Sequence, residues 1–257
     1  NKKGNFNIKK LINNSVKWSG LNGLDLAQTV TTKKKYVWQG FKTWKKDKGF
    51  EKQTTGAFDS TVDLSYIELR KLRKNHIRDI KSARNFGIKV KSAEDLDNWR
   101  IFYEMFERQQ RAFSMPGFGW KFFRELHRID RLNVTMQLAW MGNKCLGGTL
   151  LFAQGHILFH KISALEPKYL SHGTFKLLIW ESMNWAKKHG MQWYNFGVTM
   201  QSQKGLLSFK EGFCAVSRPL HTHVLPLLKS PAGFKELFEG YSTARKIWPT
   251  LPLSITK

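Results

Sequence analysis

Apolar side chains recur every three to four residues in five stretches of the chain. This spacing places the apolar positions on one face of a helix. Gly87 and Gly190 follow two of these stretches, and glycine commonly ends a helix because it adopts the left-handed conformation of the cap. The pattern predicts helices over residues 35–48, 66–86, 96–106, 120–129 and 173–188.

The predicted helix of residues 66–86 is basic over most of its outer face. Ser65 and Glu68 have the spacing of a capping box, in which the two side chains satisfy free backbone N–H groups. Its apolar stripe is Leu69, Leu72, Ile77, Ile80 and Ala83, and its basic residues are Arg70, Lys71, Arg73, Lys74, Arg78, Lys81 and Arg84. Such a face either binds phosphates or an anionic membrane, or is a solvated surface, and both interpretations stay open.

A second capped helix is expected after Ser92 and Asp95, which are good cap residues. Its inward-facing residues are expected to be Leu96, Trp99, Phe102 and Phe106.

From Asn133 onward the period changes to that of strands. A three-stranded meander is expected, with glycine-containing turns at residues 142–143 and 155–156. The predicted strands are residues 61–64, 134–141, 146–152, 157–165, 191–196 and 215–220. Helices, a meander, a further helix and further strands in this order indicate an α/β fold of the mixed α+β kind.

The composition limits the classes of function. With 257 residues, of which 41% are hydrophobic, the chain can bury a real core. Two cysteines suit a reducing compartment, and no zinc-binding or serine-hydrolase motif is present. The longest stretch without Asp, Glu, Lys or Arg, residues 145–160, is too short to span a bilayer. We therefore expect a cytoplasmic protein without a metal site, for which peripheral contact with the inner membrane face stays open.

The formal net charge of +24 implies an anionic partner. Residues 1–50 alone contain twelve lysines and two aspartates. RNA, a nucleotide-linked or lipid-linked precursor, and an anionic membrane surface all fit this charge. A set of lysine-rich solvated faces is the alternative.

A candidate reactive lysine follows the predicted strand of residues 191–196. The segment Trp193–Gly197 ends at a glycine, a short polar loop follows, and Lys210 then lies between Phe209 and a second Gly-Phe pair. An ammonium held beside aromatic rings stabilises negative charge that develops on a reacting carbonyl oxygen. The alternative is an ordinary surface lysine after a turn.

The order of a meander, a helix and a strand resembles the acetyltransferase-like fold known as GNAT. In that family the loop before the central helix binds cofactor pyrophosphate. Pro167 and Gly173 fall at the family's positions, which implies a donor-binding loop at His172, Gly173 and Thr174. Leu170 stands where the family has Arg or Gln, which favours a donor other than coenzyme A.

Residues 49–220 resemble the FemABX family and the related BioF2-like acyltransferases. The resemblance rests on the order of several short motifs: residues 61–64, 69–78, 147–148, 185–190, 194–197 and 205–210. The family has two GNAT-like halves, so the resemblance implies a tandem fold whose first half is reduced or truncated. The domains expected are a remnant first half (1–64), a helical segment (65–130), a second GNAT-like core (131–225) and a basic helical tail (226–257).

FemABX enzymes transfer an amino acid from aminoacyl-tRNA to the amine of a peptidoglycan precursor. The resemblance implies that Lys210 is catalytic and that Phe209 shapes the same channel. It further implies that Arg111 holds a phosphate of the precursor and that Tyr194, Asn195 and Gly197 orient the acceptor.

We therefore expect an N-acyltransferase with an aminoacyl-tRNA or acyl-thioester donor, such as acyl-CoA, and no tightly bound cofactor. Its acceptor is expected to be an amine of a peptidoglycan or polysaccharide precursor. One alternative is an acyl-CoA-dependent GNAT N-acetyltransferase. The other is a non-catalytic RNA- or membrane-binding protein on the same fold, which would tolerate Lys210→Ala.

Overall fold

The computed structural model describes residues 26–31, 51–129 and 133–226. The chain divides into two compact units, Asn1–Phe58 with Arg218–Gly240 and Asp59–Ser217 with Tyr241–Lys257. In the first unit, β1 (Leu26–Thr31) pairs antiparallel with β8 (Val216–Pro226). The second unit holds the candidate site.

The sheet of the second unit contains residues 59–63 of β2, followed by β7, β6, β5, β4 and β3 in this order. The strand bounds are β2 Glu51–Asp63, β3 Lys89–Ser92, β4 Val134–Met141, β5 Lys144–Gln154, β6 Ile157–Leu165 and β7 Trp193–Met200. Neighbours from β3 to β6 are antiparallel, whereas β6 and β7 run parallel because a helix connects them.

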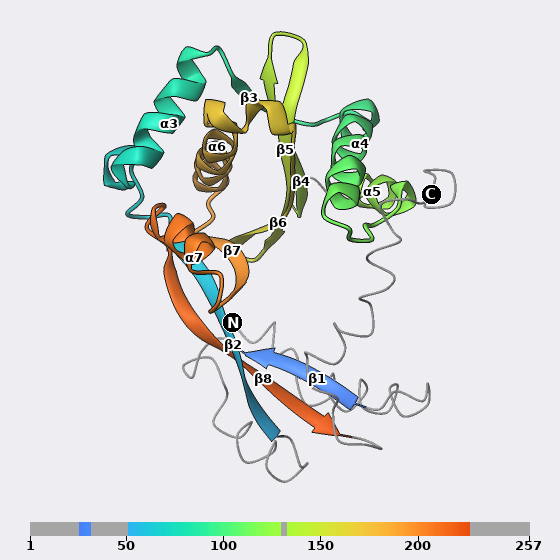
Figure 1. Cartoon of the computed structure of the whole chain (residues 1–257), viewed down its shortest axis with the longest axis vertical. Helices are drawn as coiled ribbons and strands as arrows, with labels where there is room; N and C mark the ends of the chain where they lie inside the picture. Colours follow the sequence, from blue (N-terminus) through green and yellow to red (C-terminus); the bar gives the residue numbers. More distant parts are fainter. Residues whose placement is uncertain (1–25, 32–50, 130–132, 227–257) are drawn as a thin grey trace. The chain divides into compact units, whose positions relative to one another are not determined.

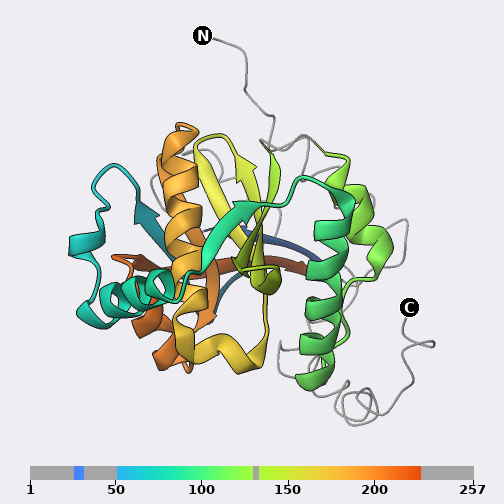
Figure 2. The same ribbon diagram turned by 90° about the horizontal axis from the view of Figure 1, so that it is seen from above.

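Helices cover both faces of this sheet (Figures 1 and 2). On one face lie α3 (Lys74–Asn85) and α6 (Thr174–Lys188), and on the other lie α4 (Leu96–Ala112) and α5 (Trp120–His127). Each pair buries its own apolar cluster against the sheet. The mixed α/β fold is therefore confirmed, with the core in two layers on either side of the strands.

The meander agrees closely with its sequence pattern. β4 and β6 have the predicted bounds, and β5 is longer at both ends. Gly142 and Gly155 adopt φ values of +58° and +59° in the connecting turns. The strand predicted for residues 61–64 is the end of the much longer β2.

The capping box predicted at Ser65 and Glu68 is wrong. The backbone N–H and hydroxyl of Ser65 donate to the Asp63 carboxylate, at 2.9 and 2.5 Å, so this segment is a turn. A short 3-10 helix, η2 (Leu69–Lys71), precedes α3, which begins only at Lys74. The expected stop at Gly87 is confirmed by its φ of +75°.

The sequence pattern did not predict two short elements, the strand β3 and the helix α7. Ser92 ends strand β3, and the cap of α4 is Asp95, whose carboxylate accepts from the Asn98 N–H at 2.7 Å. Trp99, Phe102 and Phe106 are buried as expected, but Leu96 is 39% exposed. The loop expected before Lys210 contains the helix α7 (Lys204–Glu211). β3 and α7 are too short for a hydrophobic period to identify them.

Other predicted bounds change at their ends, where sequence patterns are least informative. The helix expected over residues 120–129 ends at His127, and the strand expected over 191–196 is β7, Trp193–Met200. The helix predicted over residues 35–48 and the tail from residue 227 lie outside the described residues.

Gly173 fixes the contact between α3 and the start of α6. Its φ is +77°, and a Cβ added there would lie 2.2 Å from the Asp79 carbonyl oxygen. Gly190, at the other end of α6, has a similar φ of +74° but nothing within 4 Å of an added Cβ. Alanine substitutions at the two glycines can therefore distinguish the cost of backbone strain, present at both, from the cost of steric overlap, present only at Gly173.

We expect Gly173→Ala to lower the free energy of unfolding by several kcal/mol, because strain and overlap act together. Gly190→Ala should cost only about 1 kcal/mol, the strain alone. Urea unfolding of both variants measures the difference. Equal losses in the two variants would contradict the close contact of Gly173 with α3.

Candidate active site

The strands β6 and β7 separate at the candidate site. Their parallel pairing runs from Ile157 opposite Trp193 to Phe159 opposite Asn195, yet β6 continues to Leu165 and β7 to Met200. We call the region beyond this last pair, residues 160–163 of β6 and 196–199 of β7, the β6–β7 fork. Beyond this last pair the two strands are no longer paired with each other, so their backbone groups take other partners.

Lys210 brings a buried cation to this fork. Its Nζ donates to the carbonyl oxygens of Phe196 at 3.2 Å and Gly197 at 2.9 Å, and to Thr199 Oγ1 at 2.5 Å. The residue is only 4% exposed. Three acceptors match the three donors of an ammonium, so the charged form is well satisfied.

Gly197 makes this arrangement possible. Successive carbonyl groups of an extended strand point to opposite sides, so two of them rarely reach one ammonium. The φ of +71° at Gly197 turns the backbone and brings both carbonyl groups to Lys210. Gly197 therefore positions the lysine through its backbone.

Burial lowers the pKa of Lys210 from 10.5 to about 8, although the nearby Asp59 carboxylate raises it. The lysine is therefore mostly charged at neutral pH, but its pKa lies much closer to neutral pH than the pKa of a surface lysine does.

Asn195 connects the fork to β2 through side-chain hydrogen bonds. Its side-chain N–H donates to both Asp59 carboxylate oxygens at 2.9 Å and to Thr61 Oγ1 at 3.1 Å. Its side-chain oxygen accepts from the Gly197 N–H at 2.7 Å. Asn195 is buried, and its hydrogen bonds fix the backbone turn at Gly197 relative to β2.

Tyr194 belongs to a buried polar network with His160. Its hydroxyl lies 2.6 Å from His160 Nδ1, and Ser163 Oγ lies 2.6 Å from His160 Nε2. Burial raises the pKa of Tyr194, so its hydroxyl stays protonated. Burial, with a smaller effect of the Lys210 charge, lowers the pKa of His160 to about 4. The imidazole is therefore neutral beside the cation.

Phe209 connects α7 to the start of α6. Its ring stacks on Phe175 with centroids 5.6 Å apart and an interplanar angle of 2°. Its carbonyl oxygen accepts from His76 Nε2 at 3.0 Å. A Cβ at Gly212 would lie 2.5 Å from the same His76 nitrogen, so α3 packs tightly on the segment that carries Lys210.

The predicted donor-binding loop lies at the N-terminus of α6. The Thr174 hydroxyl donates to the Tyr169 carbonyl oxygen at 3.1 Å, and the His172 ring packs edge-on against Phe86 at 4.6 Å. The Asp79 carboxylate of α3 pairs with Lys176 of α6 at 2.5 Å. An acidic side chain therefore lies beside the helix end at which the resemblance places a pyrophosphate.

Arg111 lies in the other helical layer, in the last turn of α4. The structure does not place Arg111 among the residues that contact Lys210. The neighbouring Gln109 still connects α4 to the far end of β6, donating to the Ser163 carbonyl oxygen at 3.0 Å and accepting from the Leu165 N–H at 3.1 Å. Arg108 pairs with Glu166 just beyond β6.

The sequence analysis missed three residues of the site: Asp59, His160 and Thr199. Asp59 lies 136 positions from its partner Asn195, and no spacing in the sequence connects them. Thr199 lies two residues after Gly197, and this short spacing was the one local feature of the sequence that could have indicated a hydroxyl beside Lys210.

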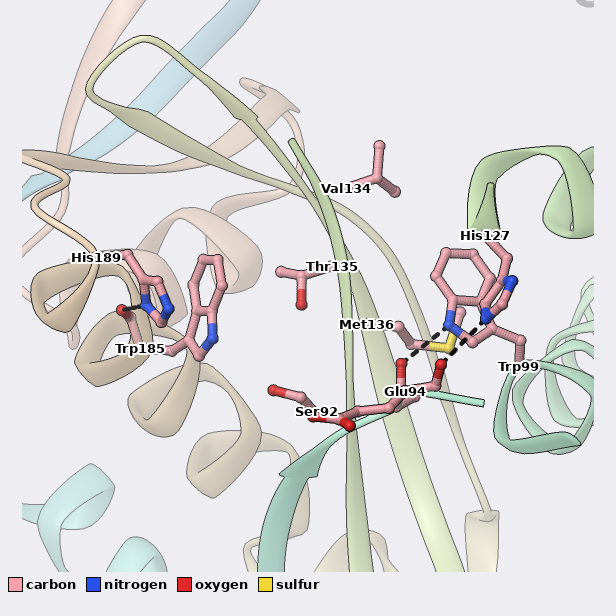
Figure 3. A pocket seen from close by; sticks show the side chains of 10 residues that line it. Ser92, Glu94, Trp99, His127, Val134, Thr135, Met136, Trp185 and His189 are labelled. Atoms are coloured by element: carbon pink, nitrogen blue, oxygen red, sulfur yellow. Dashed lines mark hydrogen bonds between the residues drawn. The ribbon is translucent and has the colours of Figure 1, made fainter. Parts of the chain in front are cut away.

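A separate hollow of about 180 Å³ lies at the opposite end of α6 (Figure 3). Trp185 and His189 line it from α6, and Trp99 and His127 line it from α4 and α5. In the described part of the chain, no three His, Cys, Asp or Glu residues are grouped to hold a metal ion. The helices described are all too short or too polar to cross a membrane.

Several solved structures share this fold. FemX superposes with a TM-score of 0.65 at 12% identity, over 90% of this chain and 78% of its own. L-PGS from Bacillus licheniformis gives 0.63 at 14% identity, over 89% and 75% of the two chains. A tandem GNAT protein from the clavulanic acid biosynthesis pathway gives 0.54 at 10% identity, over 87% and 70%. At these identities the likeness shows the fold alone. A search of the curated proteins finds no match.

The sequence itself carries the family assignment. Residues 70–210, more than half of the chain, match the family described as "Acetyltransferase (GNAT) domain". This range begins just before α3 and ends at Lys210, so it covers most of the second unit and its fork. The chain belongs to the GNAT acetyltransferase family, and it is an acyltransferase with a FemABX-like fold.

Proposed function

We propose that this protein is an N-acyltransferase that moves an aminoacyl group from aminoacyl-tRNA to an amine of a cell-envelope precursor. The observation that carries the proposal is the buried Lys210 ammonium at the β6–β7 fork. The fold shared with FemX and with a lysylphosphatidylglycerol synthetase supports it, because the latter name describes an aminoacylated lipid.

In this reaction the acceptor amine attacks the ester carbonyl carbon and forms a C–N bond. The carbonyl π electrons move to the oxygen, and the resulting oxyanion re-forms the C=O bond as the C–O bond breaks. The tRNA oxygen leaves as a hydroxyl with the proton that the attacking nitrogen loses. Lys210 stabilises the oxyanion by its charge, which acts strongly in a buried site. All three N–H groups of the ammonium have acceptors in the free protein, so the oxyanion must replace or share one of these bonds.

The surroundings of α6 support an aminoacyl-tRNA donor over coenzyme A. The backbone of α3 packs against the start of α6, where a Cβ added to Gly173 would lie 2.2 Å from the Asp79 carbonyl oxygen, so α3 covers part of the helix end that would bind a pyrophosphate. Beside α7, the exposed basic face of α3 suits a large polyanion. Acyl-CoA is the second candidate, since the family description names an acetyltransferase. A thermal-shift comparison of aminoacyl-tRNA, acetyl-CoA and amine acceptors decides between them, because a bound ligand raises the melting temperature.

The basic face of the segment formed by η2 and α3 should determine donor affinity. We expect charge reversal at Arg70, Lys74 and Arg78 to weaken tRNA binding and to flatten its salt dependence by about one unit of slope per charge removed. Arg73 is excluded because its guanidinium donates to Ser208 on α7 at 3.0 Å. Filter binding over a series of salt concentrations measures both effects.

The matched control reverses three exposed lysines on other elements, Lys89, Lys91 and Lys188. It should have a clearly smaller effect on affinity. An equal loss in both triple variants would make the effect one of total charge and would contradict a donor surface on α3.

Lys210→Ala should lower turnover on the order of 10²-fold or more with little change in donor affinity. Lys210→Arg should recover only part of this loss, because a planar guanidinium cannot occupy the position of an ammonium. Single-turnover kinetics with purified donor and acceptor measure the effect, and circular dichroism verifies folding. Wild-type turnover in Lys210→Ala would favour a binding protein without catalysis.

Turnover should fall as the pH rises through about 8, because the pKa of Lys210 is near 8 and the ammonium is the active form. The charged or titratable neighbours are Asp59 on β2 and His160 on β6, and the pKa of His160, about 4, lies far below this range. A general-base role for Lys210 would give the opposite slope. The pH profile of turnover between about pH 6 and 9 distinguishes the two roles.

Stability provides an independent measure of the same pKa. The folded pKa of about 8 lies below the ordinary value of 10.5, so the unfolded chain binds more protons between these values. The free energy of unfolding that Lys210 contributes should therefore rise with pH across this window, and Lys210→Met should remove the rise. A pH-independent difference between wild type and Lys210→Met would contradict the lowered pKa.

A further inference from the structure

The loop that connects α4 to α5, residues 113–119, presents a group of exposed apolar side chains. Phe113 is 62% exposed, Met115 43% and Phe118 54%. Single exposed apolar residues are common on protein surfaces, but several in one short loop indicate an interaction site. We call residues 113–119 the α4–α5 loop.

This loop has a defined conformation. The Met115 N–H donates to the Gln110 carbonyl oxygen at 2.9 Å and the Ser114 N–H to that of Arg111 at 2.9 Å. These two bonds form a Schellman motif, whose left-handed position is usually glycine. Here it is Ser114, with a φ of +54°. Gly117 then approaches α4 so closely that a Cβ would lie 2.8 Å from the Phe106 ring.

The apolar residues of the loop are not explained by this motif. In a Schellman motif the residue at the position of Met115 usually packs on an apolar side chain of the last helical turns. Those positions are Gln109 and Gln110 in α4. Phe118 stacks on Phe122 of α5, with centroids 4.2 Å apart, and still leaves over half of its surface exposed. The fold therefore holds apolar groups at the surface.

Basic residues surround the loop. Residues 107–128 contain five basic side chains, Arg108, Arg111, Lys121, Arg124 and Arg128, and two acidic ones, Glu107 and Glu125. Arg108 pairs with Glu166, and Arg124 and Arg128 pair with Glu125. Lys121 and Arg124 are exposed on α5 directly after the loop, and Arg128 is exposed just after the end of α5. Apolar side chains at a tip with cations around them complement an anionic bilayer, whose acyl boundary accepts the rings and whose headgroups attract the charges.

We propose that the α4–α5 loop inserts Phe113, Met115 and Phe118 into the interface of an anionic lipid bilayer. The surrounding arginines and Lys121 contact the lipid headgroups. A bilayer fits better than a protein partner because the apolar area is a small tip, and the basic side chains around it outnumber the acidic ones. The proposal stands independently of the proposed reaction, since membrane binding requires neither donor nor acceptor.

Flotation with lipid vesicles tests the proposal directly. The full chain should float with phosphatidylcholine vesicles that contain about 30 mol % phosphatidylglycerol and not with phosphatidylcholine alone. Phe113→Ser combined with Phe118→Ser should reduce partitioning by about tenfold or more. Lys121→Glu combined with Arg124→Glu should reduce it as well and weaken its salt dependence.

Phe86→Ser is the matched control, because Phe86 is 52% exposed on a different surface, at the end of α3. It should float like the wild type, and melting curves verify that all variants fold. Three results would overturn the proposal: no flotation of the wild type, flotation of the double serine variant equal to the wild type, or equal binding to neutral vesicles. A partner protein that binds this loop without lipid, together with any of these results, would assign it to a protein interface.

Discussion

The arrangement of the site depends on one interaction, the contact of the Lys210 ammonium with three oxygen atoms of β7. The pairing of β7 with β6 ends at Asn195, and the backbone then turns at Gly197. A turn in the middle of a sheet leaves carbonyl groups that need donors. Lys210 supplies these donors and places a positive charge at the same point, so the fork and the cation require each other.

Most of the surrounding structure holds this contact in place. Asn195 ties the turn to β2 through Asp59, and α3 packs against α7 through His76 and Gly212. Stacking of Phe209 on Phe175 joins α7 to α6. A side chain supported by packed helices and strands is held more rigidly than one on a free loop. This rigidity explains why a small helix of eight residues can position the lysine.

The sequence predicted the long elements, and it missed the contacts around Lys210, whose catalytic role stays a prediction. The meander and α6 have clear hydrophobic periods, so their bounds could be predicted within a few residues. β3 and α7 have four and eight residues, too few for a period. Asn195 looked like a substrate contact, yet its amide is occupied by Asp59, a partner distant in sequence. Such long-range pairing leaves no local pattern.

The pKa of Lys210 in the free protein tests the central claim most directly. NMR titration of lysine side chains labelled with ¹³C at Cε, with the Lys210 signal assigned from Lys210→Arg, measures it without any substrate. The account predicts a midpoint near 8, well below the ordinary value of 10.5, because the ammonium is buried at the fork. A midpoint at or above 10.5 would mean a solvent-exposed lysine and would contradict the account.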